Sequence, residues 1–138
     1  FSPGLRRDRI MKPVRVLIVD DEPDVLFTMK RLLTAEGHEV AVAADGGAAM
    51  LVCGEFRPDV IVLDIRMPVL DGWYVLAEVA ERDPSPRVIV CTANADTRDH
   101  TRALTLGAET VLVKPYDPEE LCSLVQVPAG AAVPSANI

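Results

Sequence analysis

Acidic residues follow two of the most apolar runs of the chain, and their positions suggest a chemical role. Asp64 directly follows the apolar residues 60–63. Asp20 and Asp21 directly follow the apolar stretch 14–19. If both runs are parallel strands, their carboxyl ends share one edge of the sheet, where ligands bind. Three carboxylates at one place repel one another and raise their own pKa values unless a cation lies among them. The pattern therefore predicts a divalent metal ion and a reactive aspartate.

Segments typical of strands and helices alternate along the chain. Short apolar runs bounded by turn residues indicate strands, and apolar residues spaced three and four apart indicate helices. We expect strands at residues 14–19, 38–43, 58–63, 87–91 and 109–113. We expect helices at residues 23–36, 46–55, 71–82, 96–106 and 117–125. Five strands that alternate with five helices predict the α/β class, with a parallel doubly wound sheet and right-handed crossovers.

The composition is that of an ordinary single globular domain. Of the 138 residues, 49% are hydrophobic and 25% are charged, which is enough apolar material for a full core. No apolar stretch approaches the length of a membrane span, and no signal-peptide pattern is present. The three cysteines are far apart and have no metal-binding spacing, which favours reduced thiols. We therefore expect a cytoplasmic protein that does not bind a membrane.

Charge is distributed unevenly. Residues 1–15 carry five basic groups and one acid, a net charge of +4. Residues 16–138 carry nine basic and twenty acidic groups, a net charge of −11. This strongly acidic charge on residues 16–138 disfavours direct binding to nucleic acid. We expect an N-terminal extension at 1–12, ahead of a start at Met11, one domain at 13–126, and a flexible tail at 127–138 that Pro128 and Pro134 keep from being helical.

Four motifs occupy the ends of predicted strands. They are Asp20-Asp21 after the first strand, Asp64 with Met67-Pro68 and Asp71-Gly72 after the third, Thr92-Ala93 at the fourth, and Lys114-Pro115 after the fifth. In this order they resemble the receiver domain of two-component response regulators, over about residues 13 to 125. The resemblance implies a flavodoxin-like sheet with the strand order 2-1-3-4-5.

Asp64 is the candidate nucleophile, because an aspartate carboxylate can hold a phosphoryl group as an acyl phosphate. Phosphoryl transfer depends on positioning and on charge neutralisation, which Mg²⁺ held by carboxylates supplies. The resemblance implies that Asp21 binds Mg²⁺ (or Mn²⁺) directly and that Asp20 assists through water. It also implies that the backbone carbonyl of Arg66, two residues after Asp64, adds a ligand.

Lys114 and Thr92 are the expected contacts to the phosphoryl group. The ammonium of Lys114 can bind one phosphoryl oxygen, and the hydroxyl of Thr92 can donate to another. Either residue alone would be an ordinary surface lysine or β-forming threonine, and only their joint placement favours a function. By resemblance, the domain is a signalling phosphoacceptor and not an enzyme, although it assists its own phosphorylation and slow dephosphorylation. The implied partners are a histidine kinase or phosphotransfer protein and an output domain or effector protein, and a homodimer stays open.

Two departures from the family concern the output. Receiver domains usually have an aromatic switch residue three positions before the lysine, where this chain has Val111. Thr92 and Val111 are therefore the expected switch positions, and we predict that loop and helix movement near residues 93–106 replaces the movement of a ring. The last helix is also short and lacks the basic residues common on dimerising regulators with winged-helix outputs. No effector domain follows within the chain, so we expect a stand-alone regulator or part of a longer one.

Particular residues count against other classes of protein. A flavin-binding fold would favour a neutral, glycine-rich or hydroxyl-rich turn where acids follow the first strand. No GxGxxG dinucleotide motif is present, and Arg66 occupies the place where a dehalogenase-type phosphatase needs a second acid. The rival that stays open is an interaction module of this fold that no longer responds to phosphate. Asp71 is expected to cap the helix that follows it, and we assign no role to His38 and His100.

Overall fold

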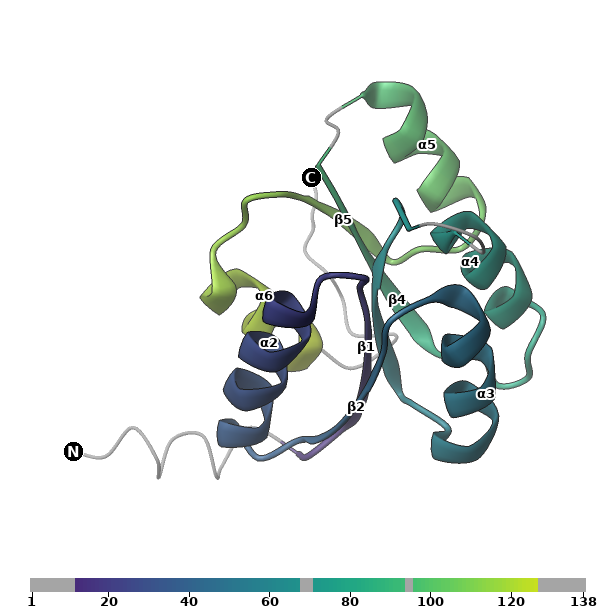
Figure 1. Ribbon diagram of the computed structural model, residues 1–138. Helices are drawn as coiled ribbons and strands as arrows, with labels where there is room; N and C mark the ends of the chain where they lie inside the picture. The colour runs from purple at the N-terminus through teal and green to yellow at the C-terminus, as the bar shows by residue number, and fades with distance from the viewer. Residues whose placement is uncertain (1–11, 68–70, 94–95, 127–138) are drawn as a thin grey trace.

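The structure, a computed structural model, describes residues 12–67, 71–93 and 96–126. These residues form a parallel five-stranded sheet with the order β2-β1-β3-β4-β5 (Figure 1). Its strands are β1 (Arg15–Val19), β2 (Glu39–Ala43), β3 (Val60–Asp64), β4 (Arg87–Thr92) and β5 (Thr110–Val113). The helices are α2 (Pro23–Ala35), α3 (Gly46–Phe56), α4 (Gly72–Ala80), α5 (Thr97–Thr105) and α6 (Pro118–Gln126). The predicted class, the five helices and the strand order are confirmed for the described part of the chain.

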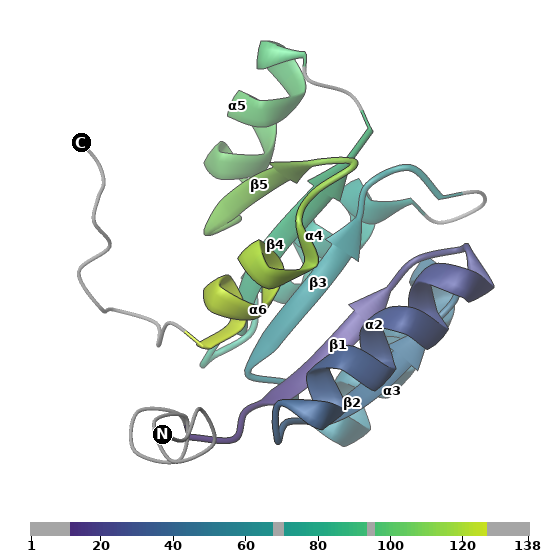
Figure 2. The ribbon, with the colours of Figure 1, turned by 90° about the vertical axis from the view of Figure 1, so that its left-hand side faces the viewer.

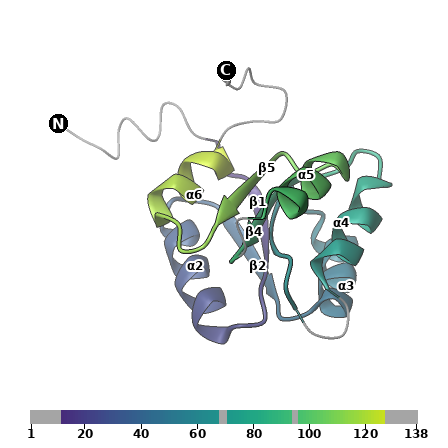
Figure 3. The same cartoon turned by 90° about the horizontal axis from the view of Figure 1, so that it is seen from above.

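Helices cover both faces of the sheet and create two cores. Figures 2 and 3 show α2 and α6 on one face, and α3, α4 and α5 on the other. The central strand β3 is buried along its whole length, so its alternate residues contribute to different cores. Ile61 and Leu63 pack with residues of α3, α4 and α5, whereas Val60 and Val62 pack with residues of α2 and α6. Each such fully buried side chain stabilises the fold by roughly 1.5–3 kcal/mol.

The observed elements differ from the predicted ones mainly at their ends. β3 includes Asp64 and β4 includes Thr92, so these residues end their strands and do not begin the loops that follow. Asp45, Asp71 and Asp96 lie just outside α3, α4 and α5 as N-caps, and each accepts a hydrogen bond from a backbone N–H of the first turn. The predicted capping role of Asp71 is confirmed, because its side chain accepts from the N–H of Tyr74 at 3.2 Å.

One arginine fixes the short last helix to the sheet. The side chain of Arg87, at the start of β4, is only 8% exposed. Its Nη1 donates to the carbonyl of Val125 at 2.9 Å, and its Nη2 donates to the carbonyl of Leu124. Its Nε donates to Glu109 at 2.7 Å. Carbonyls that a helix end leaves without partners are thus satisfied by Arg87, at the edge where the strands begin, here named the amino edge.

Some predictions concern residues beyond those that the structure describes. The predicted extension, apart from Lys12, and the predicted tail at 127–138 lie outside the described residues, and so does Pro68. The domain bounds of 13 and 126 therefore stay a prediction. Among the described residues, no helix is long and apolar enough to cross a lipid bilayer.

Candidate functional site

The edge where the strands end, here named the carboxyl edge, gathers the residues that were predicted to act together. Asp20 and Asp21 follow β1, Asp64 ends β3, Thr92 ends β4 and Lys114 follows β5. These four strands lie next to one another in the sheet. Because all of them run in parallel, residues from distant parts of the sequence meet at this edge.

Three carboxylates form the centre of the site. Asp20, Asp21 and Asp64 each offer one oxygen, and these oxygens all lie within 4.8 Å of one another. Asp20 and Asp64 are buried, whereas Asp21 is exposed to solvent. Carboxylate oxygens are the ligands that Mg²⁺ prefers, and an open side leaves room for the waters that this ion keeps. The donor set therefore fits the predicted ion.

Lys114 supplies a positive charge to this cluster from the other end of the sequence. Its Nζ lies 3.1 Å from Asp20 Oδ2 and 3.6 Å from Asp64 Oδ2. Burial alone would lower the pKa of Lys114, but the hydrogen bond to Asp20 and the charge of Asp64 outweigh burial and raise it. The ammonium thus stays charged and partly offsets the repulsion between the two buried carboxylates.

The carboxylate of Asp64 is held on both of its oxygens. Oδ1 accepts the backbone N–H of Arg66 at 3.0 Å, and Oδ2 faces the ammonium of Lys114. Burial raises the pKa of Asp64, and the charges of Asp20 and Asp21 add to this effect. The bond from Arg66 and the charge of Lys114 oppose it without cancelling it. A cation bound beside Asp64 would therefore favour its ionised, nucleophilic form.

A glycine brings the start of α4 against the end of β3 and the first residue after it. The N–H of Gly72 donates to the carbonyl of Ile65 at 3.0 Å. A Cβ at position 72 would lie 2.5 Å from the carbonyl oxygen of Asp64 and 2.6 Å from the Cα of Ile65. Such contacts with backbone atoms are too short for any side chain, so a residue without a Cβ is required here. The Asp71-Gly72 motif thus shapes the loop in which the predicted ligand Arg66 lies.

The two predicted switch positions lie on neighbouring strands. Thr92 is 3% exposed, and its carbonyl accepts the N–H of Lys114 at 2.7 Å. Val111 is partly buried and packs against the core under α5, together with Ala103 and Leu106. Val111 therefore differs from an aromatic switch residue, which would turn a ring between solvent and core. The switch roles of Thr92 and Val111 stay predictions.

Sequence reasoning missed two residues beside the site. Cys91 lies next to Asp64 in the paired strands β3 and β4, and burial raises the pKa of its thiol to about 12. Tyr116 packs against the core cluster that contains Cys91, and burial also raises the pKa of Tyr116. The register of the sheet gives a reason to look at Cys91. Nothing local in the sequence pairs it with Tyr116.

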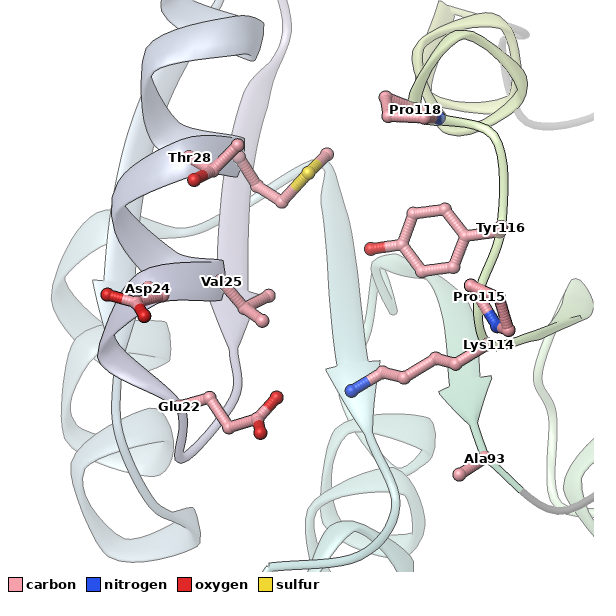
Figure 4. A pocket seen from close by; sticks show the side chains of 10 residues that line it. Glu22, Asp24, Val25, Thr28, Ala93, Lys114, Pro115, Tyr116 and Pro118 are labelled. Carbon is pink, nitrogen blue, oxygen red and sulfur yellow. The ribbon is translucent and has the colours of Figure 1, made fainter.

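A groove opens beside the acidic cluster, between the start of α2 and the loop from β5 to α6 (Figure 4). Its volume is about 610 Å³. Figure 4 shows Val25 and Thr28 of α2 facing Tyr116 and Pro118 across the groove, with the Lys114 side chain running along one end. A partner that reaches Asp64 from this side would therefore meet mainly apolar walls, the ammonium of Lys114 and the carboxylates of Glu22 and Asp24.

Fold and site together define a class of protein, the doubly wound parallel sheet that carries an acidic cluster and a partly buried lysine at its carboxyl edge. Over residues 16–126 the sequence matches the response regulator receiver domain, and the chain belongs to this family. Receiver domains are signalling domains of two-component systems, in which histidine kinases are the partners that send the signal.

The curated relatives are transcriptional regulators. The chain is 45% identical over 112 residues to the transcriptional regulatory protein PrrA of Mycobacterium bovis, covering 81% of this chain and 48% of that protein. It is 41% identical over 109 residues to the transcriptional regulatory protein TrcR of Mycobacterium tuberculosis, covering 79% of this chain and 42% of that protein. The chain thus spans about half the length of the curated relatives it matches.

Solved structures of receiver domains have the same fold. The receiver domain of the Francisella response regulator 1452 matches with a TM-score of 0.76 and 30% identity, over 81% of this chain and 93% of that one. A chain of the CheX-CheY-BeF3-Mg+2 complex from Borrelia burgdorferi matches with a TM-score of 0.79 and 31% identity, over 86% of this chain and 95% of that one. The fold assignment thus agrees with experimental structures.

Proposed function

We propose that the domain accepts a phosphoryl group on Asp64 and changes conformation in response. One observation carries this proposal: the carboxylates of Asp20, Asp21 and Asp64 converge within 4.8 Å, and the Lys114 ammonium lies against the two that are buried. A purely structural ion pair would need one carboxylate for the lysine and would not gather three. Gathered acids beside one lysine suit the neutralisation that phosphoryl transfer needs.

The same residues account for a metal ion. The carboxylates of Asp20, Asp21 and Asp64, with the carbonyl of Arg66, would hold Mg²⁺ or Mn²⁺. When bound, such an ion neutralises negative charge on the oxygens of the group being transferred. Asp21 is exposed and can approach the ion without breaking a contact, whereas Asp20 already accepts from Lys114 and from the N–H of Glu22 at 2.9 Å. This difference supports a direct role for Asp21 and an assisting role for Asp20.

In the transfer step, a carboxylate oxygen of Asp64 attacks the phosphorus atom of the donor. An O–P bond forms, and the P–N bond of a phosphohistidine breaks, leaving its electron pair on the imidazole, which takes up a proton. Lys114 then pairs with a phosphoryl oxygen in place of the Asp64 oxygen that has become part of the acyl phosphate. The hydroxyl of Thr92 donates to a second phosphoryl oxygen. Attack of water on the acyl phosphate breaks it, releases inorganic phosphate and restores the Asp64 carboxylate. In this proposal the phosphoryl group is a signal held on the domain and not a product, so the domain is a phosphoacceptor and not an enzyme.

The partners follow from this role. The donor is a sensor histidine kinase or a phosphotransfer protein, and the groove between α2 and the loop after β5 adjoins the point of attack. The receiver of the signal is an output domain or an effector protein, since the matching regulators are about twice as long as the matched segment. Residues 16–138 carry a net charge of −11, which disfavours direct binding of nucleic acid by the domain. We place the protein in the cytoplasm. The domain comprises residues 13–126, with an N-terminal extension at 1–12 and a flexible tail at 127–138. A homodimer is compatible with this role.

Intact-mass measurement tests the proposal. The protein is incubated with acetyl phosphate and Mg²⁺, and we expect the mass of one added phosphoryl group. The variant Asp64→Ala should gain none, and EDTA should prevent the gain in the wild type. Asp71→Asn is the matched control, because asparagine caps a helix as well as aspartate does and lies outside the cluster. Equal uptake by Asp64→Ala would show that the acceptor is another residue.

A second candidate function is a binding module that no longer responds to phosphate. The observation that favours it is Val111, which stands where the family has an aromatic switch residue. A domain of this kind would still bind Mg²⁺ at its acids. It would show no change beyond the acidic cluster when beryllofluoride, a phosphoryl mimic, is added with Mg²⁺.

A further inference from the structure

Helix α5 is the least firmly packed helix near the site. Of its residues Thr97–Thr105, only Ala103 is buried. The neighbouring helix α4 buries four residues, among them Val75 and Leu76. A helix with so little apolar contact depends on polar contacts for its position, and small changes in those contacts can move it.

Two polar contacts tie α5 to the segment that follows Asp64. In its first turn, Asp99 Oδ2 accepts Nη2 of Arg66 at 3.1 Å. Farther along the helix, the guanidinium of Arg102 lies 4.0 Å from the ring centroid of Trp73, in the first turn of α4. Arg66 and Trp73 stand on the two sides of the loop between β3 and α4. Helix α5 is thus attached both to the segment just after Asp64 and to the first turn of α4.

Arg66 is placed to report the charge on Asp64. Its backbone N–H donates to the carboxylate of Asp64 at 3.0 Å, so the two residues are fixed relative to each other. Its side chain is 61% exposed and can turn, whereas that of Asp99 is 26% exposed. A guanidinium matches the geometry of phosphate oxygens better than any other side chain does.

Resting on the function proposed above, we propose that Arg66 is a positioning residue whose ion pair with Asp99 holds α5 in its unphosphorylated place. A phosphoryl group on Asp64 adds up to about two negative charges close to Arg66. The guanidinium then leaves Asp99 for the phosphoryl oxygens, and the first turn of α5 is released. This transmission needs no aromatic ring at position 111, because the charge acts on α5 directly through Arg66.

A cycle of variants tests the ion pair. Asp99→Asn, Arg66→Gln and the double variant are titrated with beryllofluoride at saturating Mg²⁺, and the fluorescence of Trp73, the single tryptophan of the chain, is followed. Releasing a contact made only in the resting state makes the competent state easier to reach. We expect Asp99→Asn to lower the half-saturating concentration about two- to fivefold, the range of an exposed ion pair. In the Arg66→Gln background, Asp99→Asn should change it by less than about 1.5-fold.

A second measurement separates this role from general stability. Without the mimic, the emission of Asp99→Asn should shift toward that of mimic-bound wild type, and Arg66→Lys should preserve most of the resting spectrum. Arg98→Gln is the matched control, because it removes a charge from the same helix at a residue whose ion pair is local, with Asp96 at 3.5 Å. It should leave the titration unchanged.

Four outcomes overturn the inference. If Asp99→Asn has the same effect in both Arg66 backgrounds, the charge acts on the helix dipole and not on Arg66. If Asp99→Asn has no effect in the wild-type background, the ion pair between Arg66 and Asp99 does not hold α5 in place. If wild type takes up no phosphoryl group from acetyl phosphate, the proposed function fails, and this inference fails with it. Uptake with an unaltered Trp73 response in all variants overturns the inference alone.

Discussion

Two partly or fully buried cations occupy opposite edges of the sheet, and they differ in what holds them. Arg87, at the amino edge, donates to the carbonyls of Leu124 and Val125 and to Glu109. Lys114, at the carboxyl edge, faces the carboxylates of Asp20 and Asp64, which repel each other. Backbone carbonyls cannot leave, whereas carboxylates can exchange a lysine for a metal ion or share it with a phosphoryl group. The comparison separates a contact that builds the fold from one that is ready to be rearranged.

The largest expected effect is on the amino edge. We expect Arg87→Met to lower the free energy of unfolding by about 3 kcal/mol, because it leaves helix carbonyls and Glu109 without their partner. With Mg²⁺ present, Lys114→Met should cost less than about 1 kcal/mol, since the ion can neutralise the same acids. Urea unfolding measures both values, and beryllofluoride titration should show that only the Lys114 variant loses its response. Equal losses of stability would erase the proposed distinction.

Crowding beside Asp64 should produce the next largest effect. We expect Gly72→Ala to lower the free energy of unfolding by about 2 kcal/mol, because the added Cβ meets backbone atoms that must shift. Gly54→Ala is the matched control, since a Cβ at that helical position has nothing within 4 Å and alanine favours helix. The control should be neutral or stabilising. A Gly72→Ala variant as stable as Gly54→Ala would contradict the close approach described here.

Removing a charge from the acidic cluster should raise the free energy of unfolding, by less than the losses above. Burial raises the pKa of Asp64, so its charged form destabilises the folded protein at neutral pH. We expect Asp64→Asn to raise the metal-free free energy of unfolding by about 1 kcal/mol and to abolish stabilisation by Mg²⁺. This stabilisation by Asp64→Asn should shrink as the pH falls from the raised pKa of Asp64 toward 3.8, because Asp64 of the wild type then becomes protonated and uncharged as well. Asp21→Asn should raise the metal-free free energy of unfolding by less than Asp64→Asn does, because Asp21 is exposed to solvent. Thermal unfolding with and without Mg²⁺ measures these differences. An Asp64→Asn variant that is less stable than metal-free wild type would contradict the prediction.

The smallest effect concerns a histidine at the amino edge. Nδ1 of His38 accepts the N–H of Val14 at 3.1 Å, and burial lowers the pKa of His38 more than the charge of Glu36 raises it. Below the ordinary value of 6.5 the unfolded chain therefore binds a proton that the folded protein resists. Stability should fall by less than about 1 kcal/mol as the pH drops from 6.5 through the lowered pKa, and stay level above 6.5.

Comparing stability against pH in His38→Gln tests this assignment. The variant should lack the decline that wild type shows in that range, and the exposed His100→Gln should keep it. An unchanged decline in His38→Gln would assign it to other groups.

Much of the fold was predictable because it depends on local patterns. Apolar runs that end at charges marked the strands, and a strand such as β3 has to be covered on both faces. The meeting of Asp20, Asp21 and Asp64 followed from the parallel arrangement alone. The order of the strands came from the family resemblance, since periodicity does not tell which strands are neighbours.

The remaining contacts depend on side chains from distant elements, and no local pattern encodes them. Arg87 read as an ordinary strand residue, yet its partners lie on β5 and at the end of α6. Nothing in the sequence pairs Arg66 with Asp99, because their separation of 33 residues becomes a contact only after α5 is placed. His38 was assigned no role, and its burial depends on how α2 ends and β2 begins.

The contact between Lys114 and Asp20 joins residues 94 positions apart. A chain is synthesised from its N-terminus, and Asp20, Asp21 and Asp64 emerge well before β5 exists. Until Lys114 arrives, the acids lack the cation that holds two of them in place. An unfinished chain therefore presents a repelling, loosely placed cluster. Under the function proposed above, a kinase that needs the ordered site would act only on completed domains. Quality control of the signal would then be part of biosynthesis, since no molecule could carry the message before its last strand had joined the sheet.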